Sequence, residues 1–224
     1  MDLGGQVALV TAAGRGIGRG IAESLAEAGA SLVINSYSES TVKETAQRCE
    51  TKGARVEVCI GDITDRDKMI EMREQALSAF GKIDILVNAA GVFYPTATGD
   101  TKPVDMNRMV DINLKGTWNM ANAVVPHMVG RKRGNIINMA SVAGVFALPS
   151  YAMYCATKAG IVMMTKAMAV ELSRSGIHVN SISPGTTESP MNADIRTDPE
   201  LKPVLEFMDM LTPSGRTYSK PEDI

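Results

Sequence analysis

The sequence predicts a parallel α/β fold from two observations. Short apolar runs typical of buried strands alternate along the chain with helical segments, and a Gly-rich turn follows the first run. The predicted strands span residues 6–10, 31–35, 55–60, 84–87, 135–141 and 177–182. The predicted helices span 19–28, 41–52, 65–80, 104–128 and 151–174. Such alternation produces a doubly wound parallel sheet with helices on both faces.

Length and composition fit one domain covering residues 1–224. With 45% hydrophobic and 21% charged residues, the chain can bury a full core. A net charge of −2 gives no general attraction for nucleic acid or acidic membranes. We also expect no leader peptide and no membrane span. The three cysteines have no disulfide or metal spacing, which favours a cytoplasmic location.

The turn after the first strand has the context of a phosphate-binding loop. Gly14, Gly16 and Gly18 lie between a strand and a helix, with Arg15 and Ile17 between them. Glycines let the backbone approach a pyrophosphate, and the helix N-terminus offers free N–H groups. A plain tight turn is the alternative, and the flanking strand and helix favour the phosphate site.

The end of the second strand favours NADP(H) over NAD(H). NAD-specific folds of this kind usually place a carboxylate there for the ribose 2′-hydroxyl. Here the chain has Asn35, Ser36, Tyr37 and Ser38, which together with Arg15 would accept a 2′-phosphate. The alternatives are that NAD(H) binds, or that the serines only start the next helix.

Loops that follow other strands point to the same crevice, because ligands of such sheets bind beyond the carboxyl ends of strands. Small residues after the fourth strand would leave room for a flat ring. The candidate residues at these ends are Asp62, Ile63, Asn88, Ala89, Gly91, Ser141, Pro184 and Gly185.

Tyr154 and Lys158 are four residues apart in a predicted helix and therefore share a face. A cation beside a phenol lowers its pKa, so that Tyr154 could exchange protons with an alcohol or carbonyl oxygen. Ser141 could hydrogen-bond the same oxygen. Asn113 lies inside a predicted helix, where Asn is disfavoured; it has either a functional role or none. No metal site is expected.

Together these motifs resemble the short-chain dehydrogenase/reductase family, whose members have a three-layer Rossmann fold. The family's turn matches Thr11 to Gly18, with Ala12 replacing its first glycine, and Ala89 replaces the second Asn of the family's Asn-Asn-Ala-Gly motif. The resemblance implies that Asp62 and Ile63 contact adenine. It implies that Pro184, Gly185 and Thr187 hold the nicotinamide carboxamide, and that the catalytic tetrad is Asn113, Ser141, Tyr154 and Lys158.

The implied function is NADP(H)-dependent hydride transfer between nicotinamide and a ketone or secondary alcohol, with Tyr154 and Lys158 also contacting the cofactor. An apolar lid at about 186–218 favours an apolar or acyl substrate, as in 3-oxoacyl reductases or hydroxysteroid dehydrogenases. The alternative is a non-catalytic dinucleotide-binding redox sensor. The resemblance further implies a homo-oligomer, either a tetramer or a dimer. It also implies one more helix and strand than the sequence contains.

Overall fold

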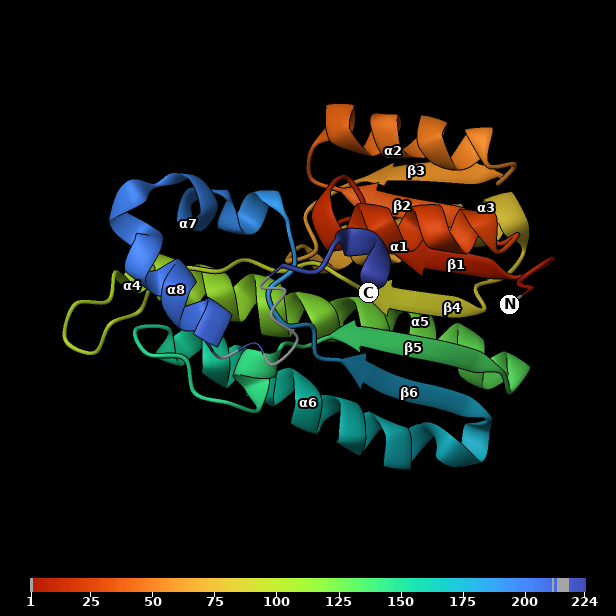
Figure 1. The fold of residues 1–224 in the computed structure, drawn as a ribbon. Coiled ribbons are helices and arrows are strands. Elements are labelled where there is room, and N and C mark those ends of the chain that lie inside the picture. The colour runs from red at the N-terminus through yellow and green to blue at the C-terminus, as the bar shows by residue number, and fades with distance from the viewer. Residues whose placement is uncertain (1, 211, 213–217) are drawn as a thin grey trace.

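The computed structural model describes residues 2–210, 212 and 218–224. A six-stranded, all-parallel sheet lies at its centre, in the order β3-β2-β1-β4-β5-β6 (Figure 1). Its strands are β1 (Val7–Val10), β2 (Ser31–Ser36), β3 (Val56–Ile60), β4 (Ile85–Asn88), β5 (Gly134–Met139) and β6 (Ile177–Ile182). The strand order reverses direction between β1 and β4, which is where doubly wound sheets bind ligands.

Helices cover both faces of this sheet, as predicted. One face packs against α1 (Gly16–Glu27) and α2 (Glu39–Thr51). The other packs against α3 (Arg66–Phe80), α5 (Thr117–Arg131) and α6 (Ala152–Leu172). Single-turn 3-10 helices occupy Val142–Gly144, Ser173–Ser175, Pro190–Asn192, Pro199–Leu201 and Pro221–Asp223.

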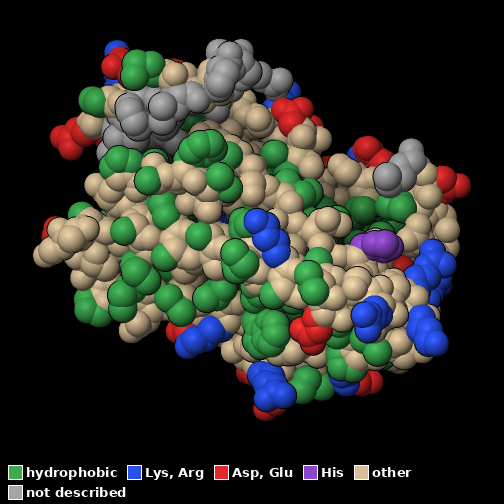
Figure 2. Space-filling view, turned by 90° about the horizontal axis from the view of Figure 1, so that it is seen from below, with side chains coloured by type: hydrophobic (Ala, Val, Ile, Leu, Met, Phe, Trp, Pro, Cys, Tyr) green, Lys and Arg blue, Asp and Glu red, His purple; other side chains and the backbone are tan. Residues whose placement is uncertain are grey.

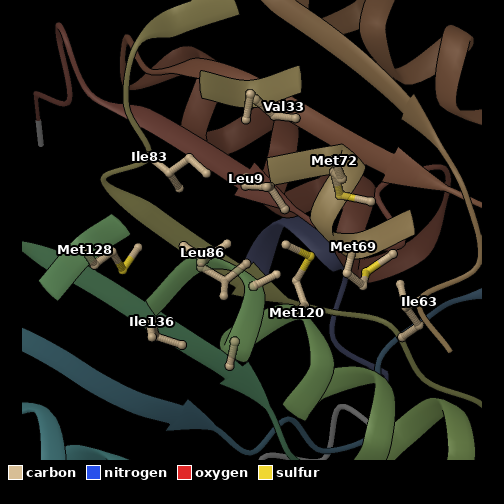
Figure 3. Close-up of a cluster of buried hydrophobic side chains, with 14 of the residues drawn as sticks. Leu9, Val33, Ile63, Met69, Met72, Ile83, Leu86, Met120, Met128 and Ile136 are labelled. Carbon is tan, nitrogen blue, oxygen red and sulfur yellow. The ribbon is translucent and has the colours of Figure 1, made fainter. Parts of the chain in front are cut away.

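The two-residue period of β1 explains how one strand supports two cores. Val7 and Leu9 point into the cluster beneath α3, α5 and α6, whereas Ala8 and Val10 point toward α1 and α2. Figure 3 shows the first cluster, where methionines from α3 and α5 meet Leu9 and Leu86. A buried strand therefore has apolar residues on both faces.

Local signals place the ends of α3. The Asp65 side chain accepts hydrogen bonds from the backbone N–H groups of Asp67 at 2.9 Å and Lys68 at 3.2 Å. At the other end, Gly81 adopts φ +73° and closes the helix. Asp65 is therefore the N-cap of α3, because these contacts satisfy N–H groups that the first turn leaves free.

The helix predicted over 104–128 is present, but it is not a regular α-helix. Helical structure continues without a break through α4 (Pro103–Met109), a π-helix (Val110–Gly116) and α5. A π-turn widens the helix by one residue and is common at functional sites. Asn113 lies in its middle, so the poor helix former marks the place where the regular pattern changes.

The segment of the expected lid lies beyond the carboxyl ends of the strands (Figure 1). It contains α7 (Ala193–Thr197) and α8 (Lys202–Met210); residues 211 and 213–217 of that prediction lie outside the described residues. Its two ends are joined because Ser219 donates to Thr186 O at 2.9 Å and Glu188 donates to Ser219 O at 2.8 Å. Within the described part of the chain, no helix is long and apolar enough to span a membrane.

Candidate active site and dinucleotide crevice

The phosphate-binding turn has a geometry that fits a dinucleotide. Gly16 adopts φ +55° and begins α1, while Arg15 at the N-cap makes no capping hydrogen bond through its side chain. The first turn also contains no acidic residue. The N–H groups of this helix start are thus free of side-chain acceptors, which is the arrangement that binds a pyrophosphate.

Two further glycines keep the turn tight. A Cβ at Gly14 would lie 2.5 Å from Thr41 Oγ1 and 2.8 Å from Ser36 Oγ. A Cβ at Gly18 would overlap the backbone carbonyl of Ala12. A side chain at Gly14 or Gly18 would therefore collide with these neighbouring atoms, and the turn could not stay as tight.

Ala12, which replaces the family's first glycine, keeps a glycine-like conformation. Its φ is +51°, in the left-handed region, and the following residue, Ala13, donates its N–H to Asn35 O at 2.8 Å. The turn therefore adopts its shape despite the substitution, at the cost of local backbone strain.

The end of β2 places three predicted residues near the turn. Ser36 is half-buried against Gly14, and Tyr37 is 82% exposed. Ser38 occupies the N-cap of α2, but its side chain makes no capping bond, so helix capping does not account for its hydroxyl. Arg15 is exposed and has no ion pair among the described residues, whereas Arg19 binds Glu44 at 2.9 Å.

The end of β3 positions Asp62 and Ile63 differently. Asp62 is exposed and accepts hydrogen bonds from both the N–H and the hydroxyl of Thr64, at 2.9 and 2.8 Å. The Ile63 side chain is buried against Gly116. Figure 3 shows it at the edge of the core cluster, next to Met69.

The end of β4 is joined to its neighbours by buried polar groups. Asn88 donates to Asn138 Oδ1 at 2.9 Å, and Asn138 donates to Thr165 Oγ1 at 3.0 Å. The Thr11 hydroxyl accepts from Ala89 N at 3.0 Å, which links this loop to the phosphate-binding turn. Gly91 follows, and a Cβ there would lie 3.6 Å from Lys158 Nζ.

The end of β6 supports the loop that carries Ser141. Val142 donates its N–H to Pro184 O at 3.0 Å, next to Gly185. Thr187 is buried and its hydroxyl reaches Gly185 O at 3.5 Å. Pro184, Gly185 and Thr187 therefore lie beside the β5 loop.

Tyr154, Ser141 and Lys158 form one cluster, as the spacing predicts. The Ser141 hydroxyl interacts with the Tyr154 phenol and acts to lower its pKa against the larger effect of burial. Lys158 Nζ lies 5.7 Å from the centre of the Tyr154 ring and donates to Met139 O at 2.7 Å. Lys158 is buried, with 5% of its surface exposed. A phenol, a hydroxyl and an amine therefore meet at the end of β5.

The electrostatics of this cluster differ in one respect from the sequence-based expectation. Burial raises the pKa of Tyr154, and only the Ser141 hydrogen bond acts in the opposite direction. The ammonium lies over the ring and toward Met139 rather than at the phenol oxygen, and Lys158 makes no resolved contribution to the pKa of Tyr154. Burial also lowers the pKa of Lys158 to about 8.

Asn113 has a defined structural role. Its Oδ1 accepts from Val92 N at 2.7 Å, and its Nδ2 donates to Val92 O at 3.0 Å and to Thr157 Oγ1 at 3.2 Å. Thr157 in turn donates to Tyr154 O at 2.8 Å. The fully buried amide therefore joins the π-helix, the β4 loop and α6.

The sequence did not predict the contacts through which several residues build this cluster. Gly144 lets the loop after Ser141 touch α6, since a Cβ there would lie 2.8 Å from the backbone of Lys158. Thr96 accepts from Met153 N at 3.1 Å, and so acts as a cap for α6 from another loop. Phe93 packs on Tyr154 at 4.7 Å between ring centres. No local pattern marks such residues, because their partners are distant in the sequence.

Known proteins resemble this chain over most or all of its length. A family model described as short chain dehydrogenase matches residues 6–200. The 3-oxoacyl-[acyl-carrier-protein] reductase FabG of Thermotoga maritima is 34% identical, with 100% of this chain and 89% of that protein covered. The (2S)-[(R)-hydroxy(phenyl)methyl]succinyl-CoA dehydrogenase subunit BbsD of Thauera aromatica is 37% identical, covering 100% and 88%.

A solved structure agrees closely with the fold. The gluconate 5-dehydrogenase from Burkholderia cenocepacia J2315, in complex with NADP and tartrate, superposes with a TM-score of 0.92 at 34% identity. The match covers 99% of this chain and 86% of that one. With its six-stranded parallel sheet and its match along nearly the whole sequence, this chain belongs to the short-chain dehydrogenase family.

Proposed function

We propose that this protein is an NADP(H)-dependent oxidoreductase that interconverts a ketone and a secondary alcohol. The observation that carries the proposal is the cluster of Tyr154, Ser141 and Lys158 at the carboxyl end of β5, beside a turn shaped for a pyrophosphate. Bound nicotinamide would supply or accept the hydride.

The chain's own residues would manage the proton and orient the substrate. Ser141 would donate a hydrogen bond to the substrate oxygen, and the Tyr154 phenol would protonate that oxygen during carbonyl reduction. In alcohol oxidation the phenolate would take the proton. Lys158 would contact the cofactor, and Asn113 would keep the loop of Val92 in place.

The cofactor preference rests on charge at the end of β2. No carboxylate precedes Glu39 there, and the exposed Arg15 follows Gly14, which lies against Ser36. A 2′-phosphate would meet a guanidinium and hydroxyls rather than a repelling carboxylate. We assign the 2′-phosphate site to Arg15, Ser36 and Tyr37, and the turn glycines Gly14, Gly16 and Gly18, with Ile17, to the pyrophosphate.

The substrate class rests on apolar side chains around the crevice. Val142 and Phe146 follow Ser141 and are 42% and 73% exposed; Met191 and Met210, on the segment 186–218, are 48% and 79% exposed. Such exposure of large apolar groups is typical of a surface that binds apolar ligands. We infer an apolar or acyl ketone, and a lid formed by residues 186–218.

A panel of ketones and alcohols with each cofactor tests the proposal. We expect reduction of apolar or thioester-linked 3-oxo substrates, with kcat/KM at least about tenfold higher for NADPH than for NADH. An Arg15→Ala variant should lose this preference. Equal or better use of NADH would refute the cofactor assignment, and the absence of turnover across the panel would favour the redox-sensor alternative.

Self-association and a cytoplasmic location complete the proposal. The exposed face of α6 carries Ala156, Ala159, Met163 and Val170, which recur at helical spacing. Figure 2 shows apolar side chains over this face, with charged groups gathered mainly toward the end where β6 begins. We infer that two copies pack through α6 in a dimer or tetramer.

The free cysteines Cys49, Cys59 and Cys155 support a reducing compartment and therefore a cytoplasmic location.

A further inference from the structure

The loop after β4 brings an aromatic ring onto Tyr154. The ring of Phe93 meets that of Tyr154 edge-on, at 4.7 Å between centres and 85° between planes. The same ring stacks on Tyr151 at 4.2 Å and 6°. Both geometries are favourable for aromatic pairs. Phe93 is thus held against one tyrosine while it contacts the other.

Both ends of this loop, residues 92–96, are fixed by hydrogen bonds. At one end, Asn113 binds both backbone groups of Val92, at 2.7 and 3.0 Å. At the other end, Thr96 donates its N–H to Ser150 O at 2.7 Å and accepts from Met153 N at 3.1 Å. The segment therefore forms a strap between the π-helix and the first turn of α6.

The strap supplies the aromatic contact of the Tyr154 ring. The Ser141 hydroxyl interacts with the phenol oxygen, and Lys158 Nζ lies over the ring at 5.7 Å from its centre. Stacking on Tyr151 prevents Phe93 from rotating away, and the two hydrogen-bonded ends prevent the loop from withdrawing. Phe93 is therefore a fixed neighbour of the Tyr154 ring.

We propose that Phe93 is a positioning residue for the reaction, which holds the Tyr154 ring so that its hydroxyl stays at Ser141. This inference rests on the proposed function, because it assigns Phe93 a role through Tyr154. Errors of about 1 Å in the placement of a reacting group can lower rates by about 100-fold.

The test compares Phe93→Leu with two matched variants. Phe93→Leu should lower kcat by about tenfold or more, with cofactor affinity unchanged within about twofold. It should also move the alkaline limb of the pH–rate profile to lower pH, because a smaller side chain admits water and reduces the burial that raises the pKa of Tyr154. Pro95 is an exposed residue of the same strap, and Pro95→Ala should change neither kcat nor the pH–rate profile. Phe93→Tyr keeps an aromatic ring at position 93 and should give wild-type values of both.

A titration of the Tyr154 phenol by NMR of labelled tyrosine gives a readout that does not require turnover. If the wild type reduces no substrate, the proposed function fails, and a shift of this titration in Phe93→Leu still supports the role of the strap. Unchanged kcat and titration in Phe93→Leu would overturn the inference. Equal losses in Pro95→Ala, or no rescue by Phe93→Tyr, would overturn it as well.

Discussion

Gly18 shows how one missing side chain allows the cofactor turn to form. The helix α1 passes so close to the Ala12 backbone that no Cβ fits at position 18. Since backbone atoms cannot swing aside like a flexible side chain, the turn must open when a Cβ is added.

Gly18→Ala should therefore destabilise the fold by about 2–3 kcal/mol and weaken cofactor binding. Gly130→Ala is the matched control, because a Cβ at Gly130, inside α5, meets nothing within 4 Å. Urea unfolding and cofactor titration measure both effects. Wild-type stability and affinity in Gly18→Ala would show that the turn tolerates a side chain.

The protein interior disfavours the charged form of Lys158, although the proposed chemistry uses this residue. Burial lowers the pKa of Lys158 from 10.5 to about 8, so the folded state disfavours the charged amine. Below pH 8 both folded and unfolded chains carry the proton, and the folded chain bears the full cost of burying the charge. Between about pH 8 and 10.5 the unfolded chain binds more protons, and stability therefore rises with pH.

Lys158→Met should remove this pH dependence. We expect wild-type stability to gain on the order of 3 kcal/mol relative to Lys158→Met as pH rises through this window. Urea unfolding at a series of pH values gives the difference, and comparison with the variant cancels the titration of other groups. Parallel stability curves for the two proteins would contradict the burial of a charged amine.

At the scale of elements, the N-terminus of α6 depends on a residue far away in the sequence. Tyr151 occupies the N-cap without a side-chain capping bond, and Thr96 Oγ1 accepts from Met153 N instead. Thr96 is buried, so no water would replace this acceptor readily.

Thr96→Val keeps the shape of the side chain but removes the acceptor. We expect a loss of about 1–2 kcal/mol in unfolding free energy, measured by urea titration. Ser173→Ala is the control, since its exposed hydroxyl bonds only Val170 O at the far end of α6. If both variants lost equal stability, the capping role of Thr96 would be wrong.

The elements also show what sequence patterns can predict. Strand positions and the cap at Asp65 follow from apolar periodicity and local side-chain chemistry. The π-helix between 110 and 116 does not, because its hydrogen bonds depend on contacts of Asn113 with Val92 and Thr157. The strap of Phe93 was missed for the same reason, since distant parts of the chain decide its position.

At the scale of the molecule, parallel topology brings the candidate residues together. The parallel order β3-β2-β1-β4-β5-β6 places the loops after all six strands at one end of the sheet. The location of the crevice was therefore predictable from strand alternation, and the identities of Tyr154, Lys158 and Ser141 from their spacing and context. The pKa of Tyr154 was not predictable, because burial outweighs the effect expected from Lys158.

The proposed contact between copies is also a property of the whole molecule. Met163 is 64% exposed on α6, and a charge there would be buried without a partner in an α6–α6 interface. Met163→Glu should shift the mass measured by light scattering to that of a smaller assembly, whereas Ile70→Glu on α3 should not. An unchanged mass for Met163→Glu would place the interface elsewhere.

Turnover by Tyr154→Phe tests the central claim most directly. This variant keeps the ring that packs on Phe93 and removes only the phenol oxygen that would transfer the proton. We expect kcat for carbonyl reduction to fall by about 1,000-fold, with cofactor affinity within about twofold of wild type. Turnover near the wild-type rate would contradict the assignment of Tyr154 as the proton donor, and with it the proposed mechanism.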